Sequence, residues 1–160
     1  MHTQGGWRKV ALIAIAWAAV LAWALAIFAL SSQPGDPIEG GGRLRLSAEK
    51  GAHFVVFAVL SIGIANALTV SGVRSRRFWW TFVLCALYAV TDELHQVLVP
   101  YRNPSVLDVF IDMAGATAGY QAFRWLSNLQ TRLGPLRPDR GQRRQAKRTV
   151  GDVRIGGRAR

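Results

Sequence analysis

Four blocks of apolar residues alternate with shorter polar segments along this chain of 160 residues. The blocks cover residues 10–30, 51–73, 78–99 and 106–125. A helix rises about 1.5 Å per residue, so each block is long enough to cross a hydrocarbon core about 30 Å thick. The pattern therefore predicts an all-α membrane protein with four transmembrane helices.

The segments between the blocks indicate how these helices are connected. Residues 74–77 and 100–105 are short links, so successive helices are expected to be antiparallel neighbours in a bundle. Residues 31–50 form a longer connection that contains two prolines and a run of three glycines. Such a composition disfavours regular structure, and we predict a loop over this whole segment.

Basic residues beside the blocks predict the orientation of the helices. Lys and Arg next to membrane spans are retained in the cytoplasm, and they occur before the first block, in residues 74–77 and after the fourth block. Both termini are therefore expected in the cytoplasm of a multi-pass inner-membrane protein. A cleaved signal peptide is the alternative for residues 10–30, but the apolar part of such a peptide has only about 7–15 residues.

The formal net charge of +11 comes largely from the C-terminal tail. Ten of the twenty basic residues follow residue 130, and no aromatic residues alternate with them, so a nucleic-acid partner is not expected. The predicted organisation is a cytoplasmic N-terminus (1–9), a transmembrane domain (10–125) and a disordered basic cytoplasmic tail (126–160). The tail either binds anionic lipid or is simply solvated.

Ionisable residues near the outer ends of the last three expected helices are the main candidates for function, because charge inside hydrocarbon is costly. At about 100° per residue, Asp108 and Asp112 lie on one face of the fourth helix. Gly115 and Gly119 share that face and allow close helix packing, so we expect the acids to point into the bundle. The polar cluster consists of Lys50, His53, Asp92, Glu93, His95, Gln96, Arg102, Asp108 and Asp112.

Two interpretations of the polar cluster are open. It contains four acids but only two residues, Lys50 and Arg102, that are always positively charged at neutral pH. These residues either form an ion-pair network that holds the helices together, or line a pocket. In a pocket, the excess negative charge would be balanced by a proton, a cation or a ligand amine. Imidazole and carboxylate suit zinc or manganese, so a metal held by His53, His95 and some of the acids is chemically reasonable. No compact metal motif supports it, and we assign no metal and no cofactor at this point.

Five short motifs, taken in order, resemble the VanZ-like family, which is named for a glycopeptide-resistance accessory protein. The resemblance covers about residues 10–125. The motifs are Ser31-Ser32-Gln33, Lys50-x-x-His53-Phe54, Tyr88-x-x-x-Asp92-Glu93-x-His95-Gln96, Val99-Pro100-x-Arg102 and Asp108-x-x-x-Asp112-x-x-Gly115. Two positions depart from the family pattern: Asp112 stands where members commonly have asparagine, and Tyr101 where glycine often precedes the arginine.

The resemblance implies a bacterial cell-envelope protein, and its prototype is linked to reduced susceptibility to teicoplanin. No established reaction comes with it. Our leading hypothesis is that the polar cluster faces outward and binds a membrane lipid, or a lipid-linked or peptidoglycan-related molecule. The alternative is an intramembrane enzyme that uses a carboxylate with His53 or His95, with or without a metal. A transporter would need polar residues that reach into the cytoplasmic half, for which Asn66 and Thr81 are the candidates, and we consider it the least favoured class.

Overall fold

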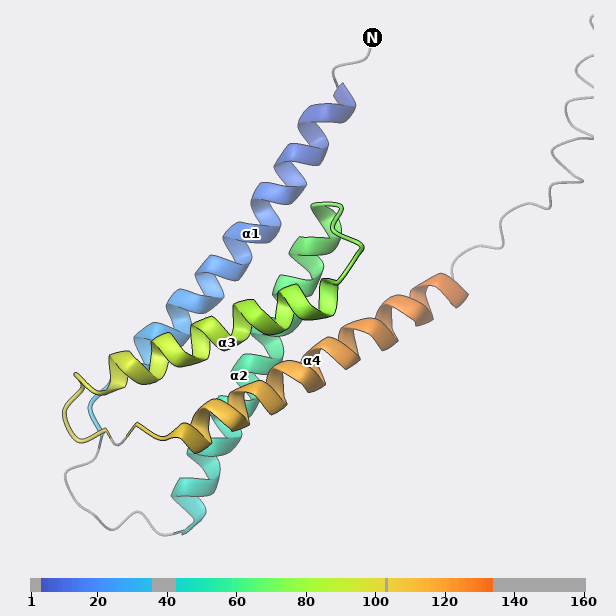
Figure 1. Ribbon diagram of the computed structural model, residues 1–160. Coiled ribbons are helices and arrows are strands. Elements are labelled where there is room, and N and C mark those ends of the chain that lie inside the picture. The colour runs from blue at the N-terminus through green and yellow to red at the C-terminus, as the bar shows by residue number, and fades with distance from the viewer. Residues whose placement is uncertain (1–3, 36–42, 103, 134–160) are drawn as a thin grey trace, which may run out of the picture. The chain divides into compact units, whose positions relative to one another are not determined.

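The protein is all-helical in the part of the chain that the structure describes (Figure 1). The structure is a computed structural model, and it describes residues 4–35, 43–102 and 104–133. Contacts divide the chain into two compact units, Met1–Leu126 and Ser127–Arg160. The described residues form four helices and no strands. They are α1 (Gln4–Ser31), α2 (Arg43–Val70), α3 (Arg77–Gln96) and α4 (Val106–Leu133).

Two of these helices are long and apolar enough to cross a membrane by length and composition, over Gly6–Ser31 in α1 and Lys50–Val70 in α2. Many of their large apolar side chains are exposed, which is the arrangement expected of helices that contact lipid tails. In contrast, α3 and α4 carry most of the polar cluster, and these polar residues lower their hydropathy.

Local signals explain where the helices begin and end. At the end of α2, Gly72 adopts a φ of 89°, while its N–H donates to the Thr69 carbonyl and the Val73 N–H donates to the Leu68 carbonyl. This pair of hydrogen bonds is the Schellman motif, which glycine favours because it has no Cβ. At the start of α4, the Ser105 hydroxyl accepts a hydrogen bond from the Leu107 N–H and caps the helix.

Two element boundaries differ from the sequence-based expectation. The predicted loop over residues 31–50 is wrong in its second half, because α2 already begins at Arg43. Helix-breaking residues end with the glycine run at 40–42, and the residues that follow are good helix formers. At the other end of the chain, α4 continues to Leu133. The remaining expected tail, residues 134–160, lies outside the described residues.

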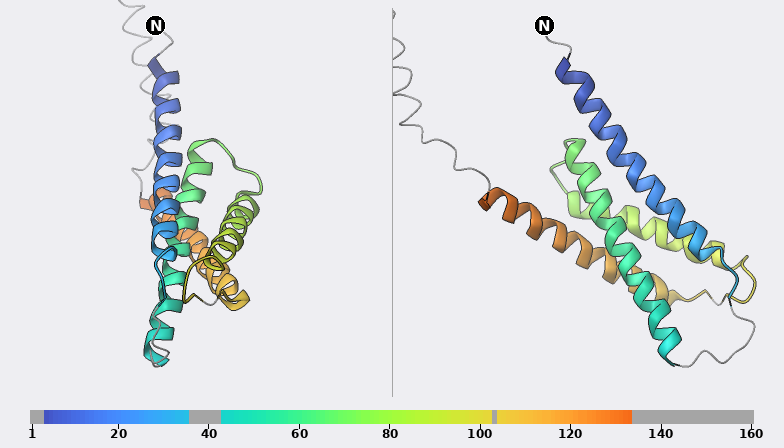
Figure 2. Two further views of the ribbon diagram at one scale, coloured as in Figure 1. Left: turned by 90° about the vertical axis from the view of Figure 1, so that its left-hand side faces the viewer. Right: turned by 180° about the vertical axis from the view of Figure 1, so that it is seen from behind.

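Within the first unit, α2 packs against the other three helices (Figure 2). A Cβ atom added at Gly115 or Gly119 of α4 would collide with the backbone carbonyl of Phe54 or Ala58 in α2. The helix backbones therefore approach each other as closely as glycine allows. The Ser61 hydroxyl in α2 also donates to the Ala116 carbonyl in α4 over 2.6 Å.

The chain direction of the helices brings four helix segments to one end of the first unit (Figures 1 and 2). These are the C-terminal ends of α1 and α3 and the N-terminal parts of α2 and α4. The connections meet there too, because the Gly35 N–H donates to the Pro100 carbonyl over 3.0 Å. Most of the polar cluster lies at this end, while Phe57, Cys85 and other apolar side chains form the core behind it.

Candidate functional site

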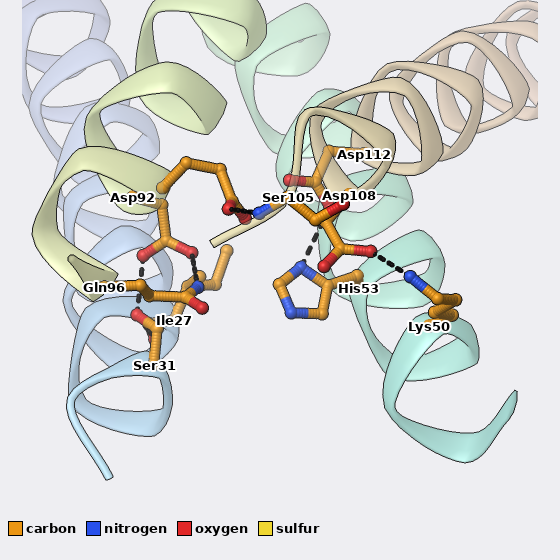
Figure 3. A network of polar contacts seen from close by, with 10 residues as sticks. Ile27, Ser31, Lys50, His53, Asp92, Gln96, Ser105, Asp108 and Asp112 are labelled. Carbon is orange, nitrogen blue, oxygen red and sulfur yellow. Dashed lines mark hydrogen bonds and ion pairs between the residues drawn. The ribbon is translucent and has the colours of Figure 1, made fainter. Parts of the chain in front are cut away.

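Polar side chains from all four helices meet at this end of the first unit (Figure 3). Asp92 of α3 is the most central of them and is only 3% exposed. Its Oδ1 atom lies 2.5 Å from the Ser31 hydroxyl of α1, and its Oδ2 atom accepts a hydrogen bond from the Gln96 side-chain amide over 3.1 Å. Both carboxylate oxygens therefore have neutral partners that fix the orientation of the group.

His53 of α2 faces Asp112 of α4, and their Nδ1 and Oδ1 atoms are 3.1 Å apart. The Asp112 side chain is completely buried, whereas that of His53 is 17% exposed. Because α4 is held against α2 by its two glycines, the carboxylate and the imidazole are brought together by backbone packing as well as by attraction. The second oxygen of Asp112, Oδ2, is buried without a hydrogen-bond partner among the described residues.

Lys50 and Asp108 form an ion pair one helical turn closer to the end of the unit. The Lys50 Nζ atom lies 2.5 Å from Asp108 Oδ1. The two side chains are 37% and 19% exposed, so this pair is more accessible than the pair of His53 and Asp112. Because solvent screens partly exposed charges, such a pair contributes little to the stability of the fold.

Glu93 of α3 reaches toward the start of α4. Its Oε2 atom accepts a hydrogen bond from the Ser105 backbone N–H over 2.8 Å. Its Oε1 atom is buried and has no hydrogen-bond partner among the described residues. The carboxylate is thus held at one oxygen, and its other oxygen is unsatisfied.

His53, Asp92 and Glu93 come together although they lie on two different helices. Each offers one ligand atom, and these atoms all lie within 4.8 Å of one another. No hydrogen bond joins His53 to either acid in the described part of the chain. One imidazole and two carboxylates therefore lie near one another without a direct hydrogen bond between the imidazole and either acid.

A cavity of about 470 Å³ opens beside this group. Its wall is mostly apolar, with a polar region where His53 and Asp92 reach it, and Arg102 of the connection after α3 also lines it. The Arg102 Nε atom donates to the Gln33 carbonyl over 3.2 Å, which holds the side chain over the end of α1. The full lining is Ile27, Leu30, Ser31, Gln33, Ala52, His53, Val56, Asp92 and Arg102.

His95 lies apart from the group formed by His53, Asp92 and Glu93. Its ring packs on Phe28 of α1 with centroids 4.3 Å apart, and its Nε2 atom lies 3.0 Å from the Ser32 hydroxyl. His95 therefore joins α3 to α1 rather than facing His53. The metal hypothesis that used both histidines does not match this placement.

Sequence reasoning missed the contribution of α1 and of the start of α4. Ser31 and Ser32 contact Asp92 and His95, and the Ser105 N–H holds Glu93. Ser31 and Ser32 belong to one of the five motifs that carry the family resemblance, and this motif could have indicated that they are part of the site. For Ser105 the contact is made by the backbone, so the residue type carries no signal.

Comparison with protein-family models gives a match to the model described as VanZ/LLP1 over residues 10–127. The match spans more than half of the chain and includes every residue of the polar cluster. Comparisons with curated proteins and with solved structures give no significant match.

Proposed function

Because this chain belongs to the VanZ/LLP1 family, we propose that it is a multi-pass inner-membrane protein that binds a lipid-linked envelope component in its cavity. The cavity beside His53 and Asp92 is the observation that carries the proposal. It combines an apolar wall with a few polar groups, which is the usual composition of a ligand site.

The proposed topology has four spans and both termini in the cytoplasm. Two helices meet the length and composition requirements of a span on their own. The polar residues of α3 and α4 are largely turned toward neighbouring helices, and burial of these groups inside the protein is what allows such helices to cross a membrane. The arginines at 74–77 support a cytoplasmic position for that connection, and in the proposed topology the opposite end with the cavity faces outward.

The proposed ligand is an amphiphile such as a polyprenyl-linked precursor or another peptidoglycan-related molecule. Its apolar chain would lie along exposed apolar side chains of α1, such as Leu30 at the edge of the cavity, at the lipid boundary. Its head group would enter the cavity, where Arg102 offers a guanidinium that suits phosphate.

Calorimetric titration of the detergent-purified protein tests this proposal. Farnesyl phosphate serves as a short polyprenyl phosphate, and farnesol serves as the control that lacks the phosphate. Val56 lines the cavity, whereas the neighbouring Val55 is 57% exposed and does not line it. We expect Val56→Trp to weaken binding of farnesyl phosphate at least tenfold and Val55→Trp to leave it unchanged. Ala52→Phe is a second cavity-filling variant, and equal binding by all variants would contradict the proposal.

A second candidate function is acid–base catalysis on the same ligand. The observation that favours it is the contact of His53 with the buried Asp112, because a carboxylate that orients an imidazole is a common feature of general bases. Hydrolysis of farnesyl diphosphate, followed by mass spectrometry, tests it. Loss of product with His53→Asn but not with His95→Asn would support catalysis, whereas no product from the wild type argues against it for this substrate class.

A role in teicoplanin susceptibility follows from the family resemblance alone. It is tested by comparing the inhibitory concentration of teicoplanin for a host with and without the chain. The cavity variant Val56→Trp and its matched control Val55→Trp show whether any effect depends on the cavity.

A further inference from the structure

Two buried acids next to the cavity have no cationic partner among the described residues. Asp92 is 3% exposed and Glu93 is 8% exposed. The other two acids of the described polar cluster have basic partners: Asp108 pairs with Lys50, and Asp112 contacts the imidazole of His53. Two carboxylates buried with neutral donors alone are unfavourable, and a cation between them would compensate their charge.

The position of that cation is indicated by the unpartnered oxygen. Glu93 Oε1 is buried and has no hydrogen-bond partner in the described part of the chain. Glu93 also belongs to the group whose ligand atoms lie within 4.8 Å of one another, together with Asp92 and His53. Ligands of one zinc ion lie roughly 3–4 Å apart, because each is about 2.0–2.2 Å from the metal. Binding of one ion therefore requires small side-chain rotations that shorten these separations.

His53 is oriented as metal-binding histidines usually are. Its Nδ1 atom faces Asp112 Oδ1 at 3.1 Å. With a proton on Nδ1 donated to that carboxylate, the lone pair of Nε2 becomes available to a metal. A buried carboxylate behind the imidazole fixes both the tautomer and the ring, and this second contact is typical of metal-ligating histidines.

Asp92 and Glu93 are also held in place by hydrogen bonds from neighbouring groups. Ser31 and Gln96 contact the two oxygens of Asp92, and the Ser105 N–H holds one oxygen of Glu93. A carboxylate oxygen has two lone pairs, so a hydrogen bond on one leaves the other free for a metal. Figure 3 shows these contacts arranged around the site from α1, α3 and the start of α4.

From this geometry we propose that His53, Asp92 and Glu93 bind one divalent transition-metal ion, with zinc and manganese as the metals that suit one imidazole and two carboxylates. The two carboxylates are negatively charged and the imidazole is neutral, so a divalent ion neutralises the total charge of the three ligands. His53 and Asp92 also line the cavity, so an ion held by them would lie at the cavity wall. Three protein ligands with an open position are the arrangement of metal sites that bind a water or a ligand.

Metal binding is measured on the protein alone, so this inference goes beyond the proposed ligand and is tested separately from it. Detergent-purified protein is stripped with a chelator and titrated with Zn²⁺ by calorimetry and with Mn²⁺ by electron paramagnetic resonance. We expect one ion per chain for at least one of the two metals. His53→Ala and Glu93→Gln should abolish stoichiometric binding, and Asp112→Ala should weaken it about 10- to 100-fold.

His95→Ala is the matched control, since it removes a histidine of α3 that packs on Phe28 of α1 rather than facing the proposed site. It should keep the wild-type stoichiometry and affinity. A folded wild-type protein that binds neither metal overturns the proposal, and so does loss of binding in His95→Ala equal to that in His53→Ala. Because the first result needs no variant, the proposal stays testable if a substitution prevents folding.

Discussion

His53 and Asp112 face each other beside the close contact that two glycines of α4 make with α2, with Nδ1 and Oδ1 3.1 Å apart and the Asp112 side chain completely buried. They are separated by 59 positions in the sequence. Two glycines of α4 bring its backbone against α2, and the pair lies at the end of that contact where the polar cluster begins. Helix packing and site geometry are therefore coupled.

Removal of Asp112 should destabilise the protein. We expect Asp112→Ala to lower the free energy of unfolding by about 3 kcal/mol, because His53 loses its buried partner. Asp112→Asn keeps an acceptor oxygen toward His53 and should cost about 1 kcal/mol. The measurement is denaturation in detergent with a chelator present, so that bound metal does not contribute. An alanine variant as stable as the wild type would show that the pair does not support the fold.

Cβ atoms at the glycines of α4 should force two helices apart. Gly115→Ala and Gly119→Ala each place a methyl group on a backbone carbonyl of α2, which cannot move aside as a flexible side chain does. We expect each to lower the free energy of unfolding by about 2 kcal/mol. The control is Gly51→Ala in α2, where nothing lies within 4 Å of the added atom and helix propensity favours alanine. Equal melting temperatures for all three variants would refute this account of the packing.

The ion pair of Lys50 and Asp108 should contribute little to stability. Both side chains are partly exposed, so a double-mutant cycle with Lys50→Met and Asp108→Asn should give a coupling energy below about 1 kcal/mol. Thermal or denaturant unfolding of the four proteins measures it. A coupling of several kcal/mol would mean that the pair is shielded from water in the membrane-embedded protein.

Cysteine accessibility should report the proposed topology. The native Cys85 is buried, and Cys85→Ala gives a background without cysteine. Ser75 and Pro104 are exposed in the two short connections. In intact cells, Pro104→Cys should react with a membrane-impermeant maleimide and Ser75→Cys should react only after permeabilisation. Equal labelling of both before permeabilisation would contradict four spans with cytoplasmic termini.

In the loop after α3, a position where the sequence departs from the family pattern also has an unusual backbone conformation. Tyr101 adopts a φ of 58°, a left-handed conformation that favours glycine. The family resemblance implies glycine at this position in many members, and the sequence analysis therefore indicated an unusual residue at 101. The neighbouring contact of Gly35 with Pro100 ties this loop to the end of α1.

The sequence by itself determined the helical class, the approximate positions of four helices, and the family. Apolar blocks and short links carry that information locally, because helix formation and hydropathy depend on neighbouring residues. It also indicated most of the polar cluster, because charged residues within an apolar block are energetically costly and therefore stand out as candidates for function. The start of α2 was misjudged because helix propensity after the glycine run outweighed the prolines before it.

Only the tertiary structure decided which polar residues meet. It separated His95, which packs on Phe28, from His53, which faces Asp112, although both histidines carry the same sequence signal. It also brought Ser31 to Asp92 and the Ser105 backbone to Glu93, contacts that join different helices and connections. The physical reason is that helix rotation and close approach are fixed by packing between helices, at residues such as Gly115 on α4 and Phe54 on α2, which lie far apart in the sequence.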